Sequence, residues 1–122
     1  MGSHPVNLAA RFLLELAALI AIGYWGWTQH DGFLKYLLAV GGPILAAVLW
    51  STFAVPDDPS RSGKAPVPVP GIVRLALELA MFGFAVWALH DAGKSLLALI
   101  LVVFVVIHYA ASYDRITWLL KQ

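Results

Sequence analysis

Four long apolar stretches follow one another along the chain, and short polar segments separate them. They cover about residues 6–27, 33–54, 71–89 and 95–112. Each is close to the roughly 20 helical residues that cross a bilayer core of about 30 Å. The apolar runs do not alternate with polar residues, and four strands are too few to close a transmembrane barrel. The pattern predicts an all-α integral membrane protein built as a four-helix bundle.

The segments between these stretches alternate in length. Two tight turns contain Asp31 and Asp91, which we expect to cap the following helices, and each also contains a glycine that can reverse the chain. The middle connection is long, and its Pro-x-Pro-x-Pro sequence favours an extended backbone. The predicted layout is a single transmembrane domain over 1–122, with hairpins at about 6–54 and 71–113, a loop at 55–70 and a tail at 114–122.

The composition agrees with a membrane location. Apolar residues make up 61% of the chain and charged residues 12%, whereas a soluble domain is typically about half apolar and about a quarter charged. A soluble fold of this size exposes too much surface to hide so many apolar side chains, so we expect the lipid bilayer as a partner. The net charge of +1 and the lack of a Lys/Arg run argue against nucleic acid binding.

The distribution of lysine and arginine predicts the orientation in the membrane. Six of these residues lie on the side of the termini and the middle connection, and two, Lys35 and Lys94, lie at the tight turns. The positive-inside rule therefore places both termini in the cytoplasm. Aromatic residues gather near the tight turns as an interfacial belt, namely Tyr24, Trp25, Trp27, Phe33, Tyr36 and Trp87. We expect the tail to continue the fourth helix along the membrane surface.

The two predicted hairpins resemble each other. Arg-Phe-Leu-Leu-Glu-Leu-Ala begins at Arg11 and Arg-Leu-Ala-Leu-Glu-Leu-Ala begins at Arg74, so five of seven positions are identical. Each of these two helices then ends in an aromatic patch and a His-Asp turn. We interpret the pattern as a duplicated hairpin whose copies are related by a pseudo-two-fold axis along the membrane normal.

Charged residues inside the first and third helices form the main candidate site. In each copy of the repeat an arginine precedes a glutamate by four residues, so the pair shares one helix face. Lipid penalises ionised side chains, which predicts that both faces point into the bundle. The ends of the second and fourth helices reach the same depth with aromatic and polar side chains. The predicted ligand-binding residues are Arg11, Glu15, Trp50, Arg74, Glu78, His108 and Tyr109.

The sequence leaves three interpretations of this layer open. In the first, Arg11 pairs with Glu78 and Arg74 with Glu15, and the closed network only fixes helix pairing, as in an accessory or scaffold subunit. In the second, the layer is a pocket that opens to the cytoplasm and binds a small polar or cationic ligand, as in a small transporter. A homodimer would then complete the pathway, because four short helices enclose little space. The third is chemistry on a lipid substrate beside His108.

The candidate site contains no recognisable catalytic or metal-binding motif. His108 has no His-x-x-x-His or Glu-x-x-His partner on its helix, and the chain has no cysteine. We therefore assign no catalytic residue, metal or other cofactor. Gly41-Gly42-Pro43 in the second helix is expected to be a packing kink rather than an ion site.

These features resemble the YrdB-like family of small bacterial membrane proteins. The resemblance rests on the two Arg-x-x-x-Glu helices and on a segment of the middle connection, and it covers essentially the whole chain. That segment is Trp50-Ser51-Thr52-Phe53, which runs into Val55-Pro56-Asp57-Asp58-Pro59. The resemblance implies a four-helix protein of the bacterial inner membrane. It implies no activity, because the family is a domain of unknown function.

Overall fold

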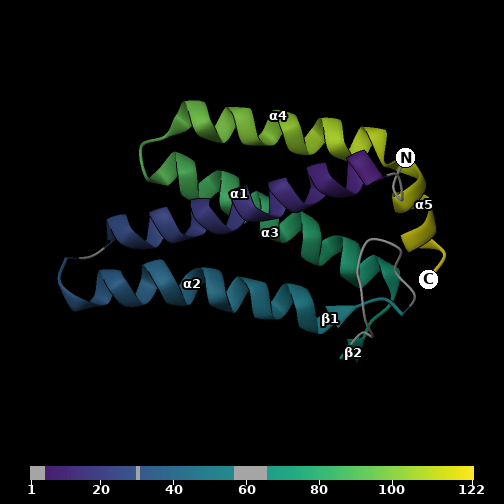
Figure 1. The fold of residues 1–122 in the computed structure, drawn as a ribbon, viewed down its shortest axis with the longest axis horizontal. Helices are drawn as coiled ribbons and strands as arrows, with labels where there is room; N and C mark the ends of the chain where they lie inside the picture. Colours follow the sequence, from purple (N-terminus) through teal and green to yellow (C-terminus); the bar gives the residue numbers. More distant parts are fainter. Residues whose placement is uncertain (1–4, 30, 57–65) are drawn as a thin grey trace.

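The structure, a computed structural model, describes residues 5–29, 31–56 and 66–122. Within these ranges it contains five α-helices and two short β-strands (Figure 1). In chain order they are α1 (Pro5–Gln29), α2 (Phe33–Thr52), β1 (Phe53–Ala54), β2 (Val67–Pro68), α3 (Gly71–Asp91), α4 (Ser95–Ala111) and α5 (Tyr113–Leu120). The helices α1 to α4 match the four predicted apolar stretches, and no end differs from the prediction by more than two residues.

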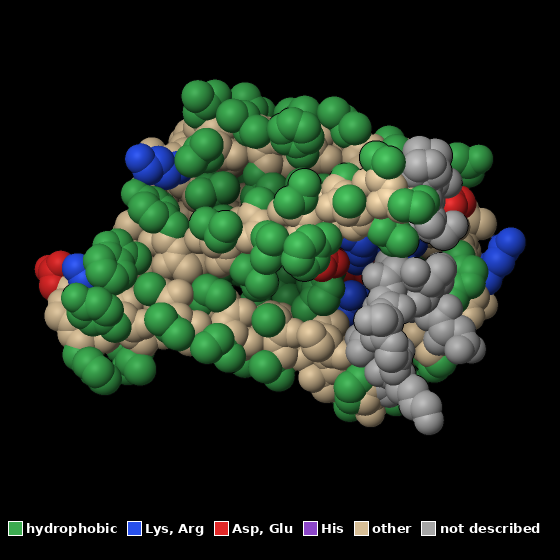
Figure 2. All heavy atoms as spheres, viewed as in Figure 1, with side chains coloured by type: hydrophobic (Ala, Val, Ile, Leu, Met, Phe, Trp, Pro, Cys, Tyr) green, Lys and Arg blue, Asp and Glu red, His purple; other side chains and the backbone are tan. Residues whose placement is uncertain are grey.

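The helices are long and apolar enough to cross a membrane. In the described part of the chain, α1, α2 and α3 are each long and apolar enough to be a candidate membrane span on their own. The helix α4 has 17 residues, or about 25 Å, and forms a fourth candidate span when it is counted together with α5 across a bend of 69°. Hydrophobic side chains predominate on the face shown in Figure 2, and a soluble monomer rarely exposes so large an apolar surface. These features indicate a membrane protein.

Three helices, α1, α3 and α4, pack against one another, and α2 lies along α1 (Figure 1). Of the α2 residues, all of which are described, Ala46 alone is buried. Both short turns lie at one end of the molecule, and β1, β2, α5 and the start of α1 lie at the opposite end. The charged stretches of α1 and α3 therefore lie at the end away from the short turns.

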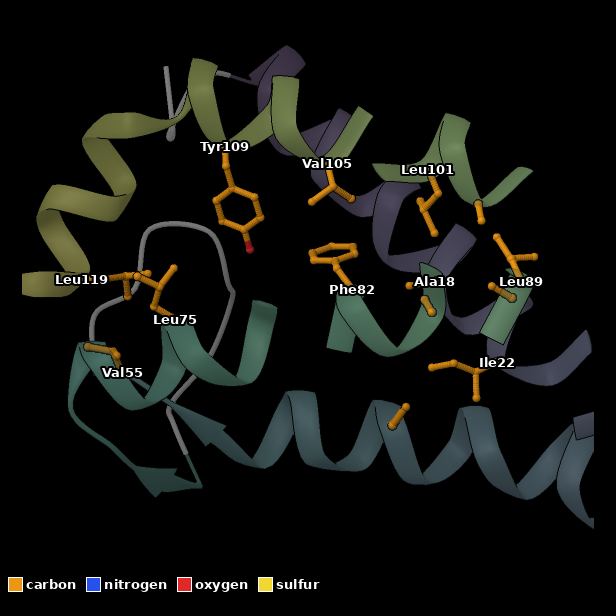
Figure 3. Packing of buried hydrophobic residues seen from close by; sticks show 14 residues of the cluster. Ala18, Ile22, Val55, Leu75, Phe82, Leu89, Leu101, Val105, Tyr109 and Leu119 are labelled. Carbon is orange, nitrogen blue, oxygen red and sulfur yellow. The ribbon is translucent and has the colours of Figure 1, made fainter. Parts of the chain in front are cut away.

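Apolar side chains from several helices form a core that includes Phe82 of α3 (Figure 3). Only 2% of Phe82 is exposed. Its ring meets that of Tyr109 edge-on, with the centroids 6.2 Å apart, and meets that of Trp50 in the same manner at 5.6 Å. Edge-to-face contacts of this kind favour one ring orientation over others. The core thus fixes the position of two residues of the predicted site.

The short turns use their glycines as predicted but not their aspartates. Gly32 and Gly93 have φ values of 72° and 81°, in the left-handed region that favours glycine. The prediction that Asp31 and Asp91 cap the next helices is wrong, because other residues occupy the cap positions and make no side-chain cap hydrogen bond. Asp91 instead ends α3 and accepts a hydrogen bond from Trp25 Nε1 at 2.9 Å.

A short pair of parallel strands joins the two ends of the long connection. Phe53 of β1 lies opposite Val67 of β2, and the amide of Val69 donates to the carbonyl of Ala54 at 2.9 Å. The proline-rich segment is therefore extended where the structure describes it, which agrees with its Pro-x-Pro-x-Pro sequence. The Asp57-Asp58 pair lies outside the described residues.

Small residues let α1 and α2 approach closely. A Cβ atom added at Gly26 would lie 2.5 Å from the carbonyl oxygen of Leu38, so the two backbones touch there. A Cβ atom added at Gly42 would lie 3.2 Å from Ile22 Cγ2. The glycine–proline motif of α2 is thus part of the helix–helix contact, within a continuous helix from Phe33 to Thr52. Small residues at such contacts are typical of membrane helices.

Gly26→Ala should separate α1 from α2 and lower the free energy of unfolding by about 1–3 kcal/mol. The added methyl group would meet backbone atoms of α2, which cannot rotate away as a side chain can. The matched control is Gly41→Ala in α2, because a Cβ atom there meets no described atom within 4 Å. Unfolding midpoints in a dodecyl sulfate titration measure the difference, and equal midpoints for the two variants would contradict the close approach.

The tail is helical, as predicted, but a bend of 69° separates it from α4. After the bend, α5 packs against α3, and Leu119 is completely buried (Figure 3). Gly71 at the start of α3 permits this contact, since a Cβ atom there would overlap the backbone of Leu119. The same packing turns Arg115, one helical turn earlier, toward the interior.

Candidate functional site

Glu78 of α3 is the centre of a cluster of charged residues, and its side chain is completely buried. Its Oε2 atom lies 2.9 Å from Arg11 Nη2, 2.9 Å from Arg74 Nε and 2.6 Å from Arg115 Nη2. Its Oε1 atom accepts a hydrogen bond from the Tyr109 hydroxyl at 2.8 Å. One carboxylate therefore connects α1, α3, α4 and α5, and contacts of this charge-assisted kind are about twice as strong as neutral hydrogen bonds.

Arg74 also closes the C-terminal end of α2. Its Nη1 atom donates to the carbonyl oxygens of Trp50 and Phe53, the latter at 2.8 Å. The last carbonyls of a helix lack amide donors within the helix, and a cation there also meets the negative end of the helix dipole. Because the same guanidinium contacts Glu78, it attaches the end of α2 to the cluster.

Arg115 belongs to this cluster, although the sequence pattern places it in the tail among the charges that set the orientation. Arg115 is buried, with only 4% of its surface exposed. The signal in the sequence is the four-residue spacing between Arg115 and Leu119, which puts both side chains on one helix face. That spacing does not say what the face packs against, because the partner depends on the bend between α4 and α5.

Glu15, which lies at the matching position of the similar α1 segment, has a different environment from Glu78. Its side chain is 26% exposed, and its ion pair is with Arg11, whose Nε atom lies 3.2 Å from Oε1. In Figure 2, acidic and basic side chains are visible in a gap between α1 and α2. Glu15 lines a pocket of about 160 Å³ there, together with Ala18, Leu19, Ala47, Trp50, Ser51 and Met81.

The predicted pairing of the four repeat residues is half right. Arg11 reaches across to Glu78, as predicted. Arg74 pairs with Glu78 on its own helix rather than with Glu15. The two glutamates are therefore chemically unequal. Within the described ranges, Glu78 has three arginine partners and Glu15 has one.

Trp50 lies close to two of these arginines. The guanidinium carbon of Arg74 lies 4.7 Å from the Trp50 ring centroid, and that of Arg11 lies 5.4 Å from it. Cation–π contacts at such distances contribute about 0.5–2 kcal/mol each, depending on how far the cation is desolvated. The ring thus helps to hold both arginines beside the pocket.

His108 is buried at the level of Arg11, with 5% of its surface exposed. The hydrogen bond between Asn7 Nδ2 and Ser112 Oγ, at 2.6 Å, aligns α1 with α4 at this end. One turn inward along these two antiparallel helices, Arg11 therefore lies opposite His108. Among the described residues, neither ring nitrogen of His108 nor Arg11 Nη1 has a hydrogen-bond partner. Arg11 Nη2 meets Glu78 as an ion pair without hydrogen-bond alignment. Bound water or a ligand normally satisfies buried groups of this kind.

The arrangement combines a rigid cluster with one accessible carboxylate. Among the described residues, no group of three or more His, Asp, Glu or Cys side chains is placed to hold a metal ion. The accessible carboxylate of Glu15 can accept hydrogen bonds, pair with a cation or carry a proton. The structure thus brings all seven predicted residues to one end of the molecule, but in different settings. Arg11, Arg74 and Tyr109 contact Glu78, Glu15 and Trp50 line the pocket, and His108 packs against the Tyr109 ring.

Comparison with known proteins identifies the family. Residues 9–106 match the family described as "Protein of unknown function (DUF2568)". The chain is also 43% identical over 119 residues to the uncharacterized protein YrdB of Bacillus subtilis (strain 168), an alignment that covers 98% of this chain and 97% of YrdB. No solved structure matches the chain. The chain therefore belongs to the YrdB-like family of proteins of unknown function (DUF2568), as its Arg-x-x-x-Glu helices and its proline–aspartate loop motif predicted.

Proposed function

We propose that this protein is a small transporter or ligand-binding protein of the bacterial inner membrane, in which Glu15 contacts a small polar or cationic ligand. In this proposal, α1–α2 and α3–α4 are tandem hairpins of a four-helix bundle with a pseudo-two-fold axis along the membrane normal. Both termini face the cytoplasm. The orientation is supported by the distribution of lysine and arginine, with six on the side of the termini and two, Lys35 and Lys94, at the opposite end. The amino groups of these two lie 4.0 Å from the Trp27 ring and 5.8 Å from the Tyr24 ring, as expected at a membrane interface.

The observation that carries the proposal is the contrast between the two glutamates of the repeat. Glu78 is completely buried among three arginines and a tyrosine, an environment that suits a structural role. Glu15 is partly exposed, has one arginine partner and faces a pocket. An ionisable group inside a membrane helix is costly to keep without a use. A cation or proton bound at Glu15 would offset part of that cost.

The pocket limits the size and chemistry of the ligand. A volume of about 160 Å³ admits a compact molecule with few heavy atoms. Its polar lining comes from the Glu15 carboxylate and the Ser51 hydroxyl, and its walls are apolar apart from the Trp50 ring. A carboxylate beside an aromatic ring is a favourable setting for a small cation such as an amine. The other predicted ligand residues contact Glu78, Trp50 or each other. We infer that they hold the residues that line the pocket in position.

Glu15→Gln should remove the ligand and leave the bundle folded. The variant keeps the size of the side chain but loses the charge that pairs with a cation, and a partly exposed ion pair contributes only about 0–1 kcal/mol to stability. Native mass spectrometry of gently extracted protein measures the outcome. We expect a retained small-molecule mass in the natural protein and none in Glu15→Gln.

Asp91→Asn is the matched control, because it removes one carboxylate charge at the short-turn end, away from the pocket. This variant should retain the ligand as the natural protein does. A ligand mass that survives in Glu15→Gln, or that is absent from the natural protein, would contradict the proposed role of Glu15.

A second candidate function is an accessory or scaffold subunit in which the charged layer is purely structural. It is favoured by the outer face of α2, where Val40, Ile44 and Val48 form a stripe at four-residue spacing and are 60%, 57% and 53% exposed. Such a stripe suits a partner subunit or a second copy of the chain in a homodimer. The same mass spectra separate the two candidates, since an accessory subunit would show partner or dimer masses that Glu15→Gln leaves unchanged and no small ligand.

A further inference from the structure

A second hollow lies on the other side of α1, between α1 and α4, and is distinct from the Glu15 pocket. It has a volume of about 450 Å³, and its lining is almost entirely apolar. The two helices are joined near one end by the Asn7–Ser112 hydrogen bond, and they diverge toward the short turns (Figure 1). Small residues on α1, including Ala17, leave the space between them unfilled. The hollow is therefore a groove that opens along the length of the helices.

The length of this groove matches one leaflet of a bilayer. Its lining on α1 runs from Leu14 to Tyr24, and its lining on the partner helix runs from Phe104 back to Lys94. Ten residues of helix rise about 15 Å, which is half of the roughly 30 Å hydrocarbon thickness of a bilayer. The groove thus extends from the interface at the short turns to about the middle of the membrane.

The groove has a cation at its interfacial mouth. Lys94 is the one charged residue among the described residues that line it, and its amino group lies 5.8 Å from the Tyr24 ring centroid. Within the described part of the chain, no carboxylate forms an ion pair with Lys94. The nearest acidic residue along the chain, Asp91, accepts hydrogen bonds from Trp25 and Gln29. An apolar slot of leaflet depth below a lysine is complementary to a lipid with an anionic headgroup.

We infer that this groove binds one acyl chain of an anionic phospholipid, whose phosphate is held by Lys94. The lipid belongs to the leaflet on the side of the short turns. Its chain fills the space that α1 and α4 leave between them, and so completes the packing of the bundle in that half of the membrane. A zwitterionic phospholipid fits the same slot, but its headgroup cation offsets the attraction of its phosphate to Lys94. The net attraction of one lysine to an anionic lipid corresponds to about fivefold in affinity.

Native mass spectrometry of the purified protein with equal amounts of dioleoylphosphatidylglycerol and dioleoylphosphatidylcholine tests this inference. The natural protein should retain phosphatidylglycerol about fivefold over phosphatidylcholine. Lys94→Gln should abolish the preference. Lys35→Gln, which removes the lysine of the other short turn outside the groove, should keep it. A preference that survives in Lys94→Gln, or that disappears equally in Lys35→Gln, would overturn the assignment of the headgroup site.

A second pair of variants tests the acyl-chain slot itself. Leu97 lines the groove and is 50% exposed, so Leu97→Trp should fill the slot without disturbing the core and should reduce retention of both lipids. Leu96, the next residue, is 70% exposed and does not line the groove, so Leu96→Trp should retain lipid as the natural protein does. Equal lipid retention by the two tryptophan variants would overturn the groove as the binding site.

Discussion

Replacement of Glu78 by glutamine should lower the free energy of unfolding by about 3–5 kcal/mol, the cost of breaking a buried ion pair by removing one partner. Glutamine has nearly the same shape as glutamate, so the change leaves no cavity. It removes the single negative charge on which Arg11, Arg74 and Arg115 converge. Three cations at 3–4% side-chain exposure would then remain close together without the carboxylate that they share. The midpoint of unfolding in a dodecyl sulfate titration measures the loss.

The similar sequence segment of α1 supplies an internal control for this prediction. Glu15→Gln is the same substitution at the equivalent position of α1, and there the lost ion pair is partly exposed and involves one arginine. We expect that variant to unfold within about 1 kcal/mol of the natural protein. If the two glutamine variants lost the same stability, Glu78 would not be the centre that holds the helices together.

The helices themselves are predictable from the sequence because the bilayer sets their length. Four apolar runs of nearly 20 residues admit few alternatives, and the cost of charge in lipid places Arg11, Glu15, Arg74 and Glu78 on inward faces. The glycines of the two short turns are predictable for a similar reason, because the chain reverses there through residues with positive φ. These features depend on residues that are near one another in the chain, and sequence patterns report such features well.

The inequality of the two glutamates is not predictable in this way. Both stand in nearly identical segments, so local pattern gives them the same environment. The difference comes from their distant neighbours. Glu78 receives Tyr109 from α4 and Arg115 from α5, whereas Glu15 faces the end of α2 and its Trp50 ring. The position of α5 depends on the 69° bend after α4. The sequence at this bend contains no strong helix-breaking residue from which the bend could be predicted.

Gly71→Ala should detach α5 and cost about 3 kcal/mol or more. A Cβ atom at this position would overlap the backbone of Leu119, and neither backbone can move without loss of the contact. Displacement of α5 exposes Leu119, which is completely buried; full burial of a leucine contributes about 1.5–3 kcal/mol. It also withdraws Arg115 from Glu78, and a hydrogen bond to a charged group contributes about 1.5–3 kcal/mol.

Trypsin reports the detachment directly, because it cleaves after arginine and needs a locally unfolded segment. In the natural protein Arg115 is 4% exposed within a helix, so cleavage after it should be slow. In Gly71→Ala the bond should be cut readily, while the spans α1 to α4 remain helical. Gly83→Ala is the control, since Gly83 lies in the same helix and a Cβ atom there meets no described atom within 4 Å. If Arg115 stayed resistant in Gly71→Ala, the glycine would not be what admits α5, and the third arginine would reach Glu78 for another reason.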